Sequence, residues 1–119
     1  MTRDPWPADT LARAEKAITD LEAFWDRFRN STTYGRQLEL PKLQPIRREL
    51  VSVTEADSYA LEHLTRLDDV CRQLTRSRQP SNFDESRVVV FGLGDVSNMR
   101  GWMAELGLVK DAVPPDLTR

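Results

Sequence analysis

Apolar residues in the first part of the chain recur every three or four positions, which is the spacing of one face of an α-helix. We expect this helix to begin near Ala8, with Asp9 or Thr10 as its capping residue. The polar run over 30–35 ends it after about 22 residues, because short polar side chains and glycine favour turns. The positions on this face are Leu11, Ala14, Ile18, Leu21, Trp25 and Phe28.

The same spacing runs over 43–74 and predicts one long helix from about Pro45 to Ser77. Residues 35–42 are then a connector, and Pro45 lies in the first turn of the helix, where proline is tolerated. The positions on this face are Leu43, Ile46, Leu50, Val53, Asp57, Ala60, Leu64, Leu67, Cys71 and Leu74.

A break in this helix at 51–54 is the alternative, because β-branched residues cluster there. Thr54 followed by Asp57 also resembles a capping box at the start of a new helix. Asp57 is the one polar residue on the apolar face, and a buried carboxylate without a partner is costly. Asp57 therefore either lies near a bend or has a partner.

A third amphipathic stretch begins near Asn82, which is followed three residues later by Glu85, a helix-start signal. Val89, Gly92, Val96, Met99, Met103 and Leu106 continue the helical spacing, and Gly107 suits a left-handed residue that ends the helix. The alternative is a short strand at 87–91 followed by a turn and a helix from Val96. Gly92 and Gly94 favour this alternative, since each costs about 1 kcal/mol relative to alanine inside a helix.

Three amphipathic stretches with short connectors predict one all-α domain over 1–119, with irregular ends at 1–7 and 108–119. We expect a small antiparallel helical bundle with one long central helix of coiled-coil-like pattern. The alternative fold is mainly α with one short strand near 87–91.

Composition narrows the class of protein further. The 17 basic and 19 acidic residues give a net charge of −2, which argues against general binding to nucleic acid or an anionic membrane. The longest apolar run, 88–91, is far shorter than the roughly 20 residues of a membrane helix, and no signal segment is recognisable. One cysteine excludes an internal disulfide framework, so we expect a cytoplasmic protein.

The strongest cofactor-like motif is the G-x-G-x-x-S pattern over Gly92–Ser97, directly after the apolar run. A strand, glycine turn and helix start of this kind hold a dinucleotide pyrophosphate. Ser97 replaces the third glycine, Asp95 would repel phosphates, and too few residues follow to complete a parallel sheet. A dinucleotide-binding fragment is therefore the weakest of our hypotheses, and we expect no cofactor.

The remaining reactive residues do not form a catalytic pattern. His63 lies beside the apolar face, and the residues after it do not match a phosphotransfer site, so we expect a surface or boundary histidine. Cys71 lies on the apolar face and is predicted to be a small buried hydrophobe. A single histidine and a single cysteine supply no recognisable zinc set. We therefore expect no metal and no enzymatic activity.

Basic residues are concentrated between Arg27 and Arg48, where only Glu39 opposes them: Arg27, Arg29, Arg36, Lys42, Arg47 and Arg48. A basic patch interleaved with aromatic residues binds nucleic-acid backbones, so an accessory protein that contacts nucleic acid is one hypothesis. Arginines near the C-terminal end of a helix are also favoured by its dipole, which explains Arg27 and Arg29 without a ligand.

Several large apolar residues lie outside the apolar faces, and a small bundle has little interior to cover them. We predict that they contact a protein partner or a second copy: Phe24, Val88, Val90, Phe91 and Trp102, with Arg47 and Arg48 as rim charges. The leading hypothesis is a non-catalytic helical interaction module, either self-associating or a small subunit of a larger protein assembly.

Overall fold

The computed structural model describes residues 7–76 and 82–110, and every regular element in these ranges is helical. The all-α class predicted from the sequence is confirmed. No strand occurs in this part of the chain, and the 87–91 run is helical. Within the same ranges, no helix is long and apolar enough to cross a membrane.

The first helix, α1, spans Ala8–Arg29, as the spacing predicted. Its N-cap is Pro7, and no side chain caps it, so the predicted cap at Asp9 or Thr10 is wrong. Both residues lie inside the first turn of α1. There, the Asp9 carboxylate still interacts favourably with the positive end of the helix dipole.

The predicted connector over 35–42 is helical instead. Helix α2 spans Thr33–Glu39, and the Thr32 side chain accepts a hydrogen bond of 3.1 Å from the Gly35 amide. A short 3₁₀ segment, η1 (Leu40–Lys42), then leads directly into α3 (Leu43–Val53). Pro41 and Pro45 each lie near the start of a helical segment, where the missing N–H needs no partner.

The predicted unbroken helix is wrong, and the alternative with a break is close to the observed structure. Helix α3 ends at Val53 and α4 spans Ser58–Arg76. The Ala56 amide donates to Val51 O (2.8 Å) and the Glu55 amide to Ser52 O (3.2 Å), which is the Schellman termination. Glu55 and Ala56 both adopt a left-handed φ of 58°.

Asp57, the polar exception in the apolar spacing, directly precedes α4. Its Oδ1 accepts a hydrogen bond of 2.8 Å from the Tyr59 amide, so Asp57 is exposed and caps the helix. Thr54 does not cap α4, because its hydroxyl donates instead to Leu50 O at 2.7 Å. The bend, rather than a buried partner, is what accommodates the carboxylate.

Helix α5 spans Asn82–Glu105 and includes three glycines, Gly92, Gly94 and Gly101. Gly107, with φ of 78°, ends it as predicted. The Leu108 amide donates to Met103 O (2.8 Å) and the Gly107 amide to Ala104 O (2.9 Å), again a Schellman termination. Leu108 is buried and returns the chain to the core, so the predicted irregular end begins with an ordered residue.

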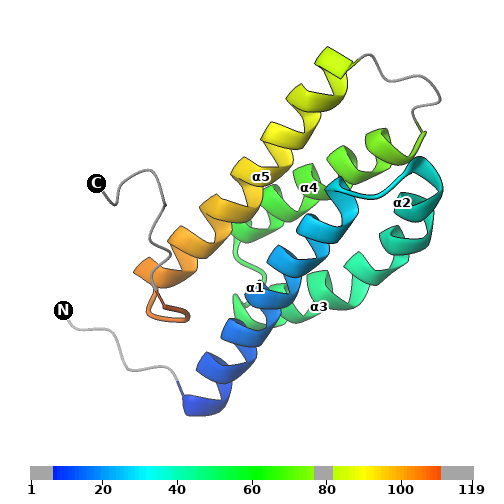
Figure 1. The fold of residues 1–119 in the computed structure, drawn as a ribbon. Helices are drawn as coiled ribbons and strands as arrows, with labels where there is room; N and C mark the ends of the chain where they lie inside the picture. Colours follow the sequence, from blue (N-terminus) through cyan, green and yellow to red (C-terminus); the bar gives the residue numbers. More distant parts are fainter. Residues whose placement is uncertain (1–6, 77–81, 111–119) are drawn as a thin grey trace, which may run out of the picture.

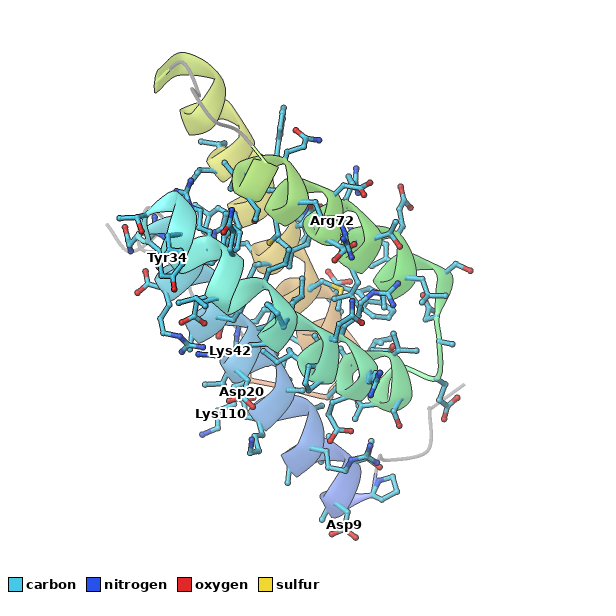
Figure 2. All side chains as sticks on the ribbon, turned by 90° about the vertical axis from the view of Figure 1, so that its right-hand side faces the viewer. Asp9, Asp20, Tyr34, Lys42, Arg72 and Lys110 are labelled. Carbon is cyan, nitrogen blue, oxygen red and sulfur yellow. The ribbon has the colours of Figure 1, made fainter. Side chains whose placement is uncertain are left out.

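Along the chain, α1 ascends, α3 descends, α4 ascends and α5 descends (Figure 1). α1 packs on α3 and α5, α4 packs on α5 and α3, and α2 lies against α4. The side chains in Figure 2 fill the space between these helices. Aromatic residues of α1 are central to the core: the Phe24 and Phe28 rings stack at 5.4 Å, and the Trp25 and Phe28 rings at 6.1 Å.

Candidate functional site

Large apolar side chains are exposed on the N-terminal half of α5, opposite its packed side. Val90 is 63% exposed, Phe91 55% and Leu93 46%, and we call these three residues the α5 outer face. Gly92, between them in sequence, is buried and faces Trp25 of α1. Because successive residues of a helix are about 100° apart, the three side chains cover a broad arc of α5 away from the core.

The other predicted contact residues have different positions. Phe24 is completely buried against Phe28, so the prediction that it lies on a contact surface is wrong; its ring fills the core instead. Trp102 is half-buried, and its ring lies 5.0 Å from that of Tyr59 on α4. The side chain of Val88 lies outside the described part of the structure.

The basic residues between Arg27 and Arg48 are not gathered into one cationic surface. Arg36 is buried, and its guanidinium donates to Phe28 O (3.1 Å) and Arg29 O (2.8 Å), which satisfies the C-terminal carbonyls of α1. The prediction of Arg36 as a surface contact is therefore wrong.

The remaining arginines of this group differ in their surroundings. Arg29 pairs with Asp26 at 2.9 Å, and Arg27 lies 3.8 Å from Glu39. Arg48 is exposed and Arg47 is half-buried. Only part of the predicted basic patch is thus available to a polyanion.

The segment Gly92–Ser97 does not form the strand and glycine turn that a dinucleotide site requires, because all of it lies within α5. Its amides are inside a helix rather than at an N-terminus, so they do not point toward a ligand. The first glycine serves helix packing instead. The segment therefore lacks the strand, glycine turn and helix start that the dinucleotide hypothesis required.

A buried polar pair joins α4 to α5, and the sequence did not predict it. The Nδ1 of His63 lies 2.7 Å from Oδ1 of Asp95, and each side chain is only 7% exposed. Arg66 Nη2 lies 3.3 Å from the same Nδ1, so the imidazole, the carboxylate and this guanidinium are in close contact. The Tyr59 ring covers the imidazole at a centroid distance of 4.4 Å. The predicted surface or boundary position of His63 is therefore wrong.

The second carboxylate oxygen of Asp95 does not take part in the contact with His63. Oδ2 is buried and has no hydrogen-bond partner among the described residues. The Arg66 Nε lies 3.4 Å from Oδ1, and the same guanidinium is 3.7 Å from Glu62 one turn earlier on α4. Arg66 is half-exposed, so it lies between solvent and the buried carboxylate.

A cleft of about 370 Å³ opens beside this pair, between α4 and α5. Asp95 lies on its wall together with Phe91 of the α5 outer face, and α4 contributes the opposite side. The lining residues are Arg66, Asp69, Val70, Gln73, Phe91 and Asp95. This size is at the lower end of the range of small-ligand pockets.

Cys71 is fully buried in the core, as predicted. Burial, together with the nearby Asp68 carboxylate, raises the pKa of its thiol to about 12. The thiolate is the reactive form of cysteine, so Cys71 is chemically inert in the folded protein. In the parts of the chain that the structure describes, no three histidine, cysteine or carboxylate side chains gather to hold a metal ion.

The α5 outer face and the adjoining cleft together form the candidate site. The sequence pointed to Val90 and Phe91 through their apolar excess, but it gave no signal for the His63–Asp95 pair, whose residues are 32 positions apart. No protein-family model, curated protein or solved structure matches this chain.

Proposed function

We propose that this chain is a non-catalytic helical interaction module, which self-associates or forms a small subunit of a larger assembly through the α5 outer face. The observation that carries this proposal is the exposure of Val90, Phe91 and Leu93 within four consecutive positions of one helix. Single exposed apolar residues are ordinary, but a contiguous group on a regular element is typical of interfaces.

The energetics favour covering this face. Transfer of apolar surface out of water contributes about 25 cal/mol per Å², so burial of three large side chains is a substantial driving force. Phe91 also has the rigid aromatic shape that is enriched at the centre of interfaces. The face lies on a helix, so the backbone that carries the three side chains is already ordered before binding.

The packing of α5 supports the same proposal. The helix has apolar residues on its inner side as well, where Val96, Met99 and Met103 are buried in the core. In a small bundle, a helix that is apolar on both sides packs one side on its own core and offers the other side to a second protein chain.

The test is the solution mass of the chain by size-exclusion chromatography with light scattering over a tenfold concentration range. We expect a concentration-dependent dimer or higher oligomer, and we expect Val90→Asp and Phe91→Asp to shift it to monomer. Leu38→Asp on α2 is the matched control, because Leu38 is 59% exposed but lies on another helix.

If the wild-type chain is monomeric, the same variants are used in affinity capture from the host. A subunit of an assembly predicts a partner that the wild-type chain and Leu38→Asp retain and that Val90→Asp loses. The proposal is wrong if the α5 variants change neither self-association nor capture while remaining folded by circular dichroism.

A further inference from the structure

We propose that the cleft between α4 and α5 is a binding site for an organic cation, a guanidinium or ammonium group on an apolar stem, with Asp95 as its anionic anchor. This inference goes beyond the interaction function, because it concerns the cleft wall rather than the exposed α5 outer face. Phe91 is the one residue that the two share.

The first support is the unsatisfied oxygen of Asp95. Its carboxylate is more than nine-tenths buried. Oδ1 lies 2.7 Å from Nδ1 of His63, whereas Oδ2 has no hydrogen-bond partner among the described residues. A buried acceptor without a donor is costly, and a ligand that brings N–H donors to the cleft relieves this cost. An ammonium or guanidinium group supplies several donors together with the complementary charge.

The second support is the guanidinium that already lies at this position. Arg66 Nε is 3.4 Å from Asp95 Oδ1, so the protein's own arginine shows which chemical group the cleft accommodates. Arg66 is half-exposed and also reaches Glu62 at 3.7 Å, one turn earlier on the same helix. Rotation of Arg66 toward Glu62 keeps its charge paired and opens the carboxylate to a ligand.

The charges of the lining favour a cation over an anion. Among the described residues that line the cleft, Asp69 and Asp95 supply two carboxylates and Arg66 supplies one basic group. Once Arg66 pairs with Glu62, an anion would meet uncompensated negative charge. Val70 and Phe91 provide the apolar part of the lining, and the face of an aromatic ring attracts cations.

The test is a titration with N-acetyl-arginine amide, followed by amide shifts in ¹H–¹⁵N NMR spectra. N-acetyl-citrulline amide, which has nearly the same shape but no charge, is the matched control ligand. We expect arginine amide to bind with a dissociation constant of about 1–10 mM, the range of a small single-anchor ligand, and to shift amides at 66–73 and 91–95. Equal binding of the citrulline compound, or shifts confined to other helices, would overturn the proposal.

The variants give effects of opposite sign. Asp95→Asn should weaken binding about tenfold or more, since it removes the anchoring charge. Asp69→Asn should weaken it about threefold, because this carboxylate contributes only at longer range. Arg66→Gln should strengthen binding several-fold, since it removes the internal competitor. Lys16→Gln, which breaks an exposed pair with Asp20 on α1, should change nothing.

The cation can arrive on a free small molecule or on a basic side chain of a bound protein. Asp95→Asn in the association assays above separates these sources: unchanged association indicates a free ligand, and weakened association indicates a side chain of the partner. If the arginine compound does not bind, the proposal of an interface at the α5 outer face still stands, so the two proposals are tested independently. If Arg66→Gln does not strengthen binding, Arg66 does not occupy the ligand's position and the proposal is wrong.

Discussion

Gly92 of α5 lies directly against the ring of Trp25 of α1, so that a Cβ atom at position 92 would overlap the Cζ2 and Cη2 atoms of the indole. Trp25 is itself buried and stacks on Phe28, which leaves the indole little room to move. The glycine thus permits close approach of α1 and α5 under the N-terminal half of α5. The same contact fixes Val90, Phe91 and Leu93 on the side of α5 that faces away from the core.

We expect Gly92→Ala to destabilise the protein by about 1–3 kcal/mol, because overpacking against a rigid ring outweighs the better helix propensity of alanine. Gly94→Ala is the matched control, since nothing lies within 4 Å of a Cβ at that position. It should instead stabilise the protein by about 0.5–1 kcal/mol. Urea unfolding of both variants measures the difference, and equal signs for the two would refute this packing.

The turn between α3 and α4 contains a non-glycine residue in a glycine-like conformation. Glu55 has φ of 58° at the end of α3, where a residue with a Cβ is strained by roughly 1–2 kcal/mol. Glu55→Gly should raise the unfolding free energy by about 0.5–1 kcal/mol after the larger entropy of glycine in the unfolded chain is counted. Glu62→Gly, on the exposed side of α4, should lower it by about 1 kcal/mol. Thermal and urea unfolding test both, and a loss of stability in Glu55→Gly would contradict the left-handed turn.

A buried arginine joins α5 to α1. Arg100 binds Glu22 through two hydrogen bonds of 2.8 Å, lies 3.3 Å from Glu15 and donates to Thr19 at 3.2 Å. Its side chain is 10% exposed, whereas both glutamates are about two-fifths exposed. Replacing it therefore leaves carboxylates that water can partly solvate.

We expect Arg100→Met to destabilise the protein by about 1–3 kcal/mol, and Arg100→Lys by less, because lysine keeps the charge but loses the two-point contact. Lys16→Met removes an exposed pair with Asp20 on one helix and should cost no more than about 0.5 kcal/mol. Urea unfolding with an unchanged m-value is the measurement. A neutral Arg100→Met would mean that this network does not hold α5 on α1.

The helical spacing predicted α1 well because one unbroken apolar face is enough to specify a helix that packs on a core. It failed at Asp57, since the 3-4 spacing continues across the left-handed turn of Glu55 and Ala56 as if no turn existed. Neither residue type signals such a turn, which usually contains glycine or asparagine. It also failed at α2, because residues 35–42 were predicted to be a connector before Pro45, whereas α2 and η1 occupy this range and lead directly into α3.

The candidate site could be predicted only in part. Val90 and Phe91 stood out because they are apolar and outside the helical spacing, and that property depends on the sequence alone. Asp95 gained its importance from His63 and Arg66, which come from another helix. Their meeting depends on how α4 and α5 are rotated and shifted against each other, and a one-residue shift in either helix would separate them.

The raised pKa of Cys71 makes stability depend on pH in alkaline solution. Burial shifts the thiol from its ordinary pKa of 9.0 to about 12, so the folded state keeps a proton that the unfolded state loses between these values. The contribution of this group is therefore fully present below about pH 9 and is lost as the pH rises toward about 12. Lysines and tyrosines also titrate there, so the test compares urea unfolding of the wild-type protein with that of Cys71→Ala from pH 8 to pH 11. We expect Cys71→Ala to be less stable at pH 8, because it leaves a small cavity, and the difference between the two proteins to shrink as pH rises.

In parallel, the thiol of the native protein should react with a disulfide reagent at pH 8 only as fast as the chain opens, and urea should accelerate the reaction strongly. Rapid modification of the folded protein, or a pH-independent difference between the two proteins, would show that Cys71 is not enclosed between α4 and the rest of the core.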